Sequence, residues 1–175
     1  TDPSYRGQMV AMTAPQIGNT GINDEDMESD RPQVEAFVVR QASPLTSNWR
    51  ARQDLSQFLR EHGIIALSDV DTRSLTRHIR AFGAMKAAVS TEDLSPESLV
   101  AKAQNAPDIS DRNLVADVSC QAPYVWAQGS PQGWQPARTT SAQRQIVAFD
   151  CGVKRSILCH LVDLGVLKKT IPGFI

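Results

Sequence analysis

The chain has 175 residues, of which 41% are hydrophobic and 21% are charged, and its formal net charge is −1. This composition is that of an ordinary globular protein, and it gives no electrostatic reason to expect a nucleic acid or an anionic membrane as partner. No apolar run approaches the roughly 20 residues that span a bilayer, and the N-terminus lacks the regions of a signal peptide. The three cysteines suit neither a disulfide framework nor a zinc site, so a cytoplasmic location is expected.

Short apolar runs alternate with helical patterns in the first part of the chain. Residues 8–13 and 34–40 predict strands, and the Gly-, Asn- and Asp-rich segment between them predicts a loop. Asp54 has the position of an N-cap and Gly63 that of a C-terminal glycine, so a helix is predicted between them. Residues 64–67 then predict a buried strand.

Two further helices follow with the same pattern of caps and apolar stripes. Asp71 or Thr72 caps the first of them, Gly83 ends it, and its apolar stripe consists of Leu75, Ile79 and Phe82. Ser95 caps the second, with Pro96 at its first position, and its predicted inner face consists of Leu99, Val100 and Ala103. Three short runs predict strands: 85–89, 114–118 and 124–126.

The last part of the chain predicts the opening of a second domain. Residues 130–144 have the Pro-, Gly-, Gln- and Ser-rich composition of a linker. A strand at 145–149, a glycine-bearing turn and a helix at 155–163 form the first half of a βαβ unit. The tail from 166 to 175 contains two lysines and a Pro-Gly pair, so we do not expect it to form the parallel strand that should follow.

Four strings of residues resemble a known family when they are taken in this order. They are Thr1-Asp-Pro-Ser-Tyr5, Gln16-Ile-Gly-Asn-Thr-Gly-Ile-Asn-Asp24, Asp69-Val-Asp-Thr-Arg-Ser-Leu-Thr-Arg77 and Val147-Ala-Phe-Asp-Cys-Gly-Val-Lys-Arg155. Together they closely resemble the small, glutamine-hydrolysing subunit of carbamoyl phosphate synthetase, from Thr1 to about Gly165.

The resemblance implies an α/β fold class and a division into domains. Residues 1–129 would form the family's N-terminal domain, of the swivelling β/β/α type, without its opening strand-rich stretch of about forty residues. Residues 130–144 would be a linker, and 145–175 the truncated start of a class I glutamine amidotransferase domain, which is flavodoxin-like. The chain is therefore expected to be a fragment of the small subunit.

The resemblance also implies a reaction and a partner. The family supplies ammonia from L-glutamine for the synthesis of carbamoyl phosphate, which feeds arginine and pyrimidine biosynthesis. The partner would be the large subunit, which would bind ATP and Mg²⁺, so no cofactor is expected in this chain. Neither nucleic acid nor membrane is expected as a partner.

The catalytic cysteine of such glutaminases is not expected among these residues. A nucleophile elbow needs small residues two positions before and after the cysteine, whereas Cys151 has Phe149 and Val153 there. We therefore expect Cys151 to have a packing role, Cys159 to lie in the packed face of its helix, and His160 to lie at the surface. The fragment alone is predicted to be inactive.

Ser4 is the one residue to which the resemblance assigns a ligand. In the family, the serine of the Asp-Pro-Ser-Tyr string reaches toward the bound glutamine. A hydroxyl beside a proline is held on a stiff turn and can bond a carboxylate or an amide. The alternative is that Ser4 only closes a local turn with Asp2.

Two other functions stay open on the sequence alone: a binding or assembly module that reuses this domain, and an unrelated nucleotide-binding α/β protein. Lys154 and Arg155 open a helix after a glycine, which is a weak hint of phosphate binding. The acidic run at 24–30 lacks the glycine of a calcium loop and predicts a solvated loop. His62 and His78 lie near helix C-termini without a second ligand at metal spacing, so no metal site is predicted.

Overall fold

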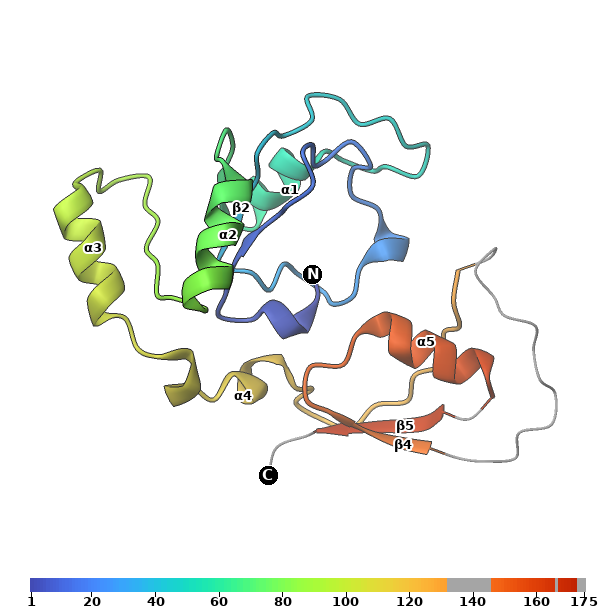
Figure 1. Ribbon diagram of the computed structural model, residues 1–175. Helices are drawn as coiled ribbons and strands as arrows, with labels where there is room; N and C mark the ends of the chain where they lie inside the picture. Colours follow the sequence, from blue (N-terminus) through green and yellow to red (C-terminus); the bar gives the residue numbers. More distant parts are fainter. Residues whose placement is uncertain (132–145, 166, 173–175) are drawn as a thin grey trace. The chain divides into compact units, whose positions relative to one another are not determined.

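The computed structural model describes residues 1–131, 146–165 and 167–172 (Figure 1). They form an α/β structure with two compact units. Unit 1 consists of Thr1–Arg6, Met27–Asp30 and Asn113–Ile175, and unit 2 of Gly7–Asp26 and Arg31–Arg112. The units therefore do not follow the predicted boundary at residue 129, and the predicted domains remain a prediction. All but the first two residues of the predicted linker lie outside the described residues.

A parallel sheet of three short strands organises unit 2. It contains β1 (Met9–Ala11), β2 (Ala36–Val38) and β3 (Ile65–Leu67) in the order β1-β2-β3, and Val10, Phe37 and Ala66 share one register position. The three predicted strands are confirmed, although each is shorter than predicted. The buried apolar side chains of this unit come from β2 and the next helix: Ala36, Val39, Phe58 and Leu59.

Helices α1 (Leu55–Glu61) and α2 (Thr72–Phe82) confirm the predicted caps. The Asp54 carboxylate accepts a hydrogen bond from the Gln57 backbone N–H at 2.8 Å, and the Asp71 carboxylate accepts one from that of Ser74 at 3.0 Å. Such caps satisfy donors that have no partner within the helix. Gly83 ends α2 with a φ of 84°, a conformation that favours glycine.

The segment after α2 is packed less closely than its sequence predicts. Ser95 caps α3 (Pro96–Asn105) as predicted, but α3 has no buried residue and Val100 is 55% exposed. The predicted strand at 85–89 is absent: within the described part of the chain, these residues have no regular secondary structure and pair with no strand. The remaining short turns are η2 (Asp24–Asp26) and η3 (Ile109–Asp111).

In unit 1, the predicted strand at 114–118 is a helix, α4 (Leu114–Val118). Asn113 caps it, because its side-chain oxygen accepts a hydrogen bond from the Ala116 backbone N–H at 3.3 Å. Apolar runs this short do not distinguish a strand from a helix by their periodicity. The predicted strand at 124–126 is reduced to a single bridge between Tyr124 and Thr170.

The strand and helix predicted at the start of the second domain are confirmed as β4 (Ile146–Asp150) and α5 (Arg155–Asp163). The prediction for the tail is wrong, because β5 (Leu167–Pro172) pairs in parallel with β4. Two interactions stabilise β5: α5 packs against it, and Thr170 exchanges backbone hydrogen bonds of 3.0 and 2.8 Å with Tyr124. Pro172 lies in the last position of β5, where a missing N–H costs little.

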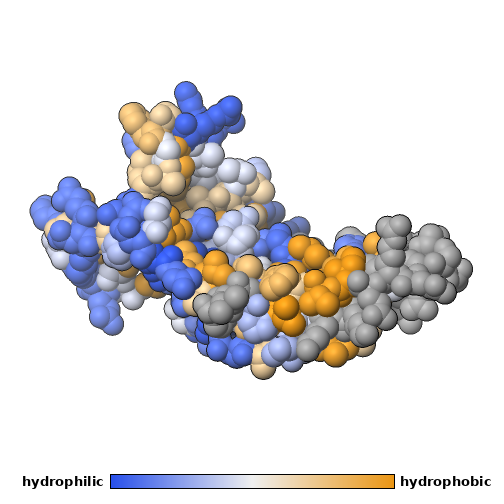
Figure 2. All heavy atoms as spheres, turned by 90° about the horizontal axis from the view of Figure 1, so that it is seen from below, coloured by the Kyte–Doolittle hydropathy of each residue, from blue (hydrophilic) through white to orange (hydrophobic). Residues whose placement is uncertain are grey.

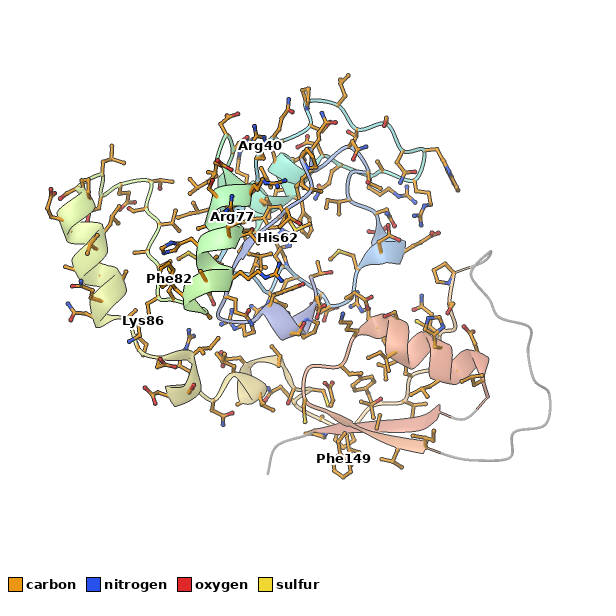
Figure 3. All side chains as sticks on the ribbon, viewed as in Figure 1. Arg40, His62, Arg77, Phe82, Lys86 and Phe149 are labelled. Carbon is orange, nitrogen blue, oxygen red and sulfur yellow. The ribbon has the colours of Figure 1, made fainter. Side chains whose placement is uncertain are left out.

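The face of the β4–β5 sheet that lies away from α5 is apolar and open. Phe149 points to this side (Figure 3), and Figure 2 shows hydrophobic residues gathered there. Phe149 is 69% exposed and Val147 50% exposed, whereas Leu158 of α5 is only 1% exposed. The core of unit 1 therefore lies on one side of its sheet.

Candidate functional site

Ser4 lies in a turn of 3₁₀ helix, η1 (Pro3–Tyr5), near the beginning of the chain. Asp2 caps this turn, since its Oδ1 accepts hydrogen bonds from the Ser4 backbone N–H at 3.0 Å and from the Ser4 hydroxyl at 2.7 Å. Pro3 is buried and Ser4 is exposed. The turn with Asp2 is thus present, and a ligand could still reach the exposed Ser4 side chain. A role of Ser4 in binding glutamine stays a prediction.

Asp2 also connects this turn to the start of α5. Its Oδ2 lies 2.5 Å from the Lys154 ammonium, and its side chain is only 18% exposed. Burial alone would raise the pKa of Asp2, but the hydrogen bonds from Lys154 and Ser4 outweigh burial and lower it. The hydrogen bond to Asp2 in turn raises the pKa of Lys154. Both groups are therefore held in their charged forms.

The turn between β4 and α5 fits closely against Pro3. The Asp150 Oδ1 accepts hydrogen bonds from the backbone N–H groups of Gly152 at 2.9 Å and Val153 at 3.0 Å. Gly152 has a φ of 94°, and a Cβ placed on it would lie 2.6 Å from the Val118 Cγ2 and 3.2 Å from the Pro3 Cβ. Only glycine fits here, because a side chain would be strained and would also clash.

The N-terminus of α5 is capped from a distant part of the sequence. Lys154, at the N-cap position, makes no side-chain capping bond. Instead, Glu28 Oε2 accepts a hydrogen bond from the Ser156 backbone N–H at 2.9 Å, and the Glu28 carbonyl accepts one from that of Arg155 at 3.1 Å. The acidic run at 24–30 is therefore more than the predicted solvated loop, since one of its carboxylates complements the positive end of a helix.

This cap weighs against the nucleotide-binding alternative. The weak hint of phosphate binding came from the two cations Lys154 and Arg155. Lys154 pairs with Asp2, and Arg155 pairs with Asp30. The backbone N–H groups of Arg155 and Ser156 already donate hydrogen bonds to Glu28. A phosphate would have to displace three carboxylates from this position, so the turn is better explained as a structural connection.

The cysteines differ in their surroundings. Cys159 is buried, as predicted, and burial raises the pKa of its thiol. Cys151 is exposed, so its predicted packing role is wrong: it follows the last residue of β4 and its side chain does not enter the core. His160 is exposed, as predicted, and its Nδ1 lies 3.4 Å from the Ser130 hydroxyl. Neither Cys151 nor Cys159 has small residues two positions before and after it, as a nucleophile elbow needs.

Unit 2 contains an open cavity of about 370 Å³ that the sequence did not reveal. Its lining consists of Arg40, Gln41, Asp69, Val70 and Asp71. The Asp71 carboxylate in this lining already caps α2, and it lies 3.9 Å from the Arg40 guanidinium. Two of the charged groups in this lining are thus already engaged, Asp71 as a helix cap and Arg40 as its neighbour. Within the described ranges, no group of three His, Cys, Asp or Glu residues could hold a metal ion, and no helix could cross a membrane.

Comparison with known proteins gives one consistent result. The model of the family described as "Carbamoyl-phosphate synthase small chain, CPSase domain" matches residues 1–89. The chain is 46% identical to the carbamoyl phosphate synthase small chain of Syntrophotalea carbinolica, over 99% of this chain and 46% of that protein.

Two other curated relatives with the same name are similar to the chain to the same degree. The protein of Thermosynechococcus vestitus is 43% identical over 99% of this chain and 46% of its own length. That of Aquifex aeolicus is 44% identical over 98% of this chain and 47% of its own length. The chain thus spans a little less than half the length of the curated relatives that it matches.

Proposed function

The chain belongs to the carbamoyl-phosphate synthase small chain family, and on this premise we propose that it takes part in supplying ammonia from glutamine for the synthesis of carbamoyl phosphate. The observation that carries this proposal is the family match over residues 1–89, together with 46% identity to a small chain over 99% of this chain. The product would serve arginine and pyrimidine biosynthesis in the cytoplasm. ATP and Mg²⁺ would bind the large subunit, and this chain would need no cofactor of its own.

Within that function, we propose that residues 1–175 provide structure and subunit contacts rather than covalent chemistry. The residues around the candidate nucleophile support this. In a nucleophile elbow the nucleophile itself sits on a sharp, strained turn, but here the positive φ belongs to Gly152 and not to Cys151. The finer fold assignments, a swivelling first domain and a flavodoxin-like second one, are part of the same proposal.

A chimera tests the proposed function directly. In it, this chain replaces the matching part of the Syntrophotalea carbinolica small chain, and the chimera is mixed with that organism's large subunit. We expect glutamine-dependent formation of carbamoyl phosphate. A chimera that folds and binds the large subunit, yet supports synthesis only from added ammonia, would contradict the proposal.

The isolated chain is expected to release no ammonia from glutamine above the uncatalysed rate. Losing a nucleophile and its base removes essentially all covalent catalysis. Cys151 has Phe149 and Val153 where a nucleophile elbow needs small residues, and the positive φ of this turn belongs to Gly152. The measurement is ammonia release by this chain and by its Cys151→Ala variant. Release that this substitution abolishes would refute the prediction.

Replacing Ser4 with alanine in the chimera is expected to raise the KM for glutamine while changing kcat little. Loss of one hydrogen bond of about 0.5–1.5 kcal/mol corresponds to a factor of about 2 to 10. Asp2→Ala is the control, because it removes the acceptor of the η1 turn, together with the ion pair to Lys154, and leaves the Ser4 hydroxyl in place. Equal increases in KM for the two variants would mean that Ser4 acts only through the turn.

A further inference from the structure

A stripe of arginines runs along the exposed face of α2. Arg73, Arg77 and Arg80 follow one another at intervals of four and three residues, which places them on one side of a helix. All three residues are exposed, whereas Thr72 is buried and Leu75 is half-buried. No Asp or Glu occurs within the helix. We call these three residues the arginine stripe; Figure 3 labels Arg77, its central member.

The arginine stripe has no ionic partner in the part of the chain that the structure describes. The ion pairs found there involve other cations, such as Arg50 with Glu25 and Asp26, and Lys102 with Asp93. The arginines of α2 therefore differ from Arg50, whose guanidinium hydrogen-bonds to carboxylates of its own unit.

Of the three arginines, only Arg80 lies where the helix dipole favours a cation, in the last turn of α2. Like charges three or four residues apart on a helix repel one another. Arg73 lies in the first turn, where the helix dipole disfavours a cation. The chain as a whole carries a net charge of −1, so these three positive charges do not reflect a generally basic composition. The stability of the helix therefore does not explain Arg73 and Arg77.

We propose that the arginine stripe is a docking surface for an acidic face of a protein partner. The inference rests on the proposed function, in which this partner is the large subunit. Guanidinium groups bind carboxylates with two parallel hydrogen bonds, and arginine is enriched at protein interfaces. A discrete acidic face fits the stripe better than a nucleic acid does, because the carboxylates of Asp69 and Asp71 lie just before it and would repel a continuous polyanion.

The substitution Arg77→Glu separates docking from folding. It places a carboxylate between Arg73 and Arg80 at the spacings that form favourable pairs, so the thermal midpoint should stay the same or rise. Binding of the large subunit, measured by titration calorimetry with the chimera, should weaken by at least about tenfold, because a like charge then faces the acidic partner. The dependence of this binding on salt concentration should also decrease in the variant.

The control is Arg52→Glu, which changes the charge equally at an exposed arginine outside α2 and should bind like the unchanged protein. If the Arg77→Glu chimera binds the large subunit as tightly as the unchanged chimera does, this inference is overturned and the proposed function stands. An unchanged chimera that does not bind the large subunit would overturn both. If a short DNA duplex binds the unchanged chimera but not Arg77→Glu, while both bind the large subunit equally well, the stripe is assigned to nucleic acid and the inference is overturned.

Discussion

Replacing Gly152 with alanine is expected to lower the free energy of unfolding of unit 1 by about 2–5 kcal/mol. A non-glycine residue at positive φ costs about 1–2 kcal/mol, and overpacking adds about 1–3 kcal/mol. Both costs apply here, because Gly152 has a φ of 94° and a Cβ on it would lie 2.6 Å from the Val118 Cγ2. Pro3 is buried and belongs to the η1 turn that holds Ser4, so it cannot move without disturbing that turn.

Gly165→Ala is the matched control for this substitution. Gly165 also has a positive φ, of 70°, but nothing lies within 4 Å of a Cβ placed on it. Alanine there should cost only the backbone strain, about 1–2 kcal/mol. Chemical denaturation of the two variants and the unchanged chain gives the comparison. Equal losses of stability in the two variants would show that the contact with Val118 and Pro3 does not constrain the turn.

The second large effect is expected from Asp150→Ala, which should cost about 2–4 kcal/mol. Asp150 is only 6% exposed, and its Oδ1 accepts hydrogen bonds from the backbone N–H groups of Gly152 and Val153. Alanine would leave both donors without that acceptor. An unsatisfied group costs about 1–3 kcal/mol when it is buried, and the lower part of this range applies to each donor because Gly152 and Val153 are half-buried. Asp150→Asn keeps an acceptor oxygen and should cost less. Equal denaturation midpoints for the alanine variant and the unchanged chain would contradict this account.

Asp150→Asn also has a spectroscopic consequence. The Tyr124 hydroxyl lies 3.5 Å from the Asp150 Oδ2, and burial, together with this negative charge, raises the pKa of Tyr124. The substitution removes the negative charge of Asp150, so of these two causes only burial still raises the pKa of Tyr124. The absorbance of the phenolate should therefore develop at lower pH in the variant. An unchanged titration would mean that the carboxylate has no influence on the phenol.

The elements that could be predicted from the sequence are those that local chemistry determines. Asp54, Asp71 and Ser95 each accept a hydrogen bond from a backbone N–H three residues further on, so the residues that fix these helix starts are close in sequence. Helix α5 was predicted with both of its bounds, because its apolar stripe and the glycine before it are equally local. The recognition of the family likewise depended on short contiguous strings.

The features that could not be predicted depend on contacts between distant residues. Glu28 caps α5 across 128 positions, and no local pattern distinguishes it from the other carboxylates of its run. Strand β5 pairs with β4 and bridges to Tyr124, so its lysines and its proline gave a misleading local signal. The exposed Cys151 was missed for the same reason, since burial is decided by what packs around a residue.

The path of the chain between the units has a consequence for biosynthesis. The chain passes from one unit to the other after Arg6, Asp26, Asp30 and Arg112. Unit 1 is built from three separate stretches of the chain, so a single proteolytic cut cannot release it. It also cannot fold completely until the last of these stretches, which begins at Asn113, has been synthesised. At about 5–20 residues per second, Glu28 waits on the order of ten seconds for the helix that it caps. Throughout that interval the N-terminal turn and the acidic run are open to chaperones and proteases.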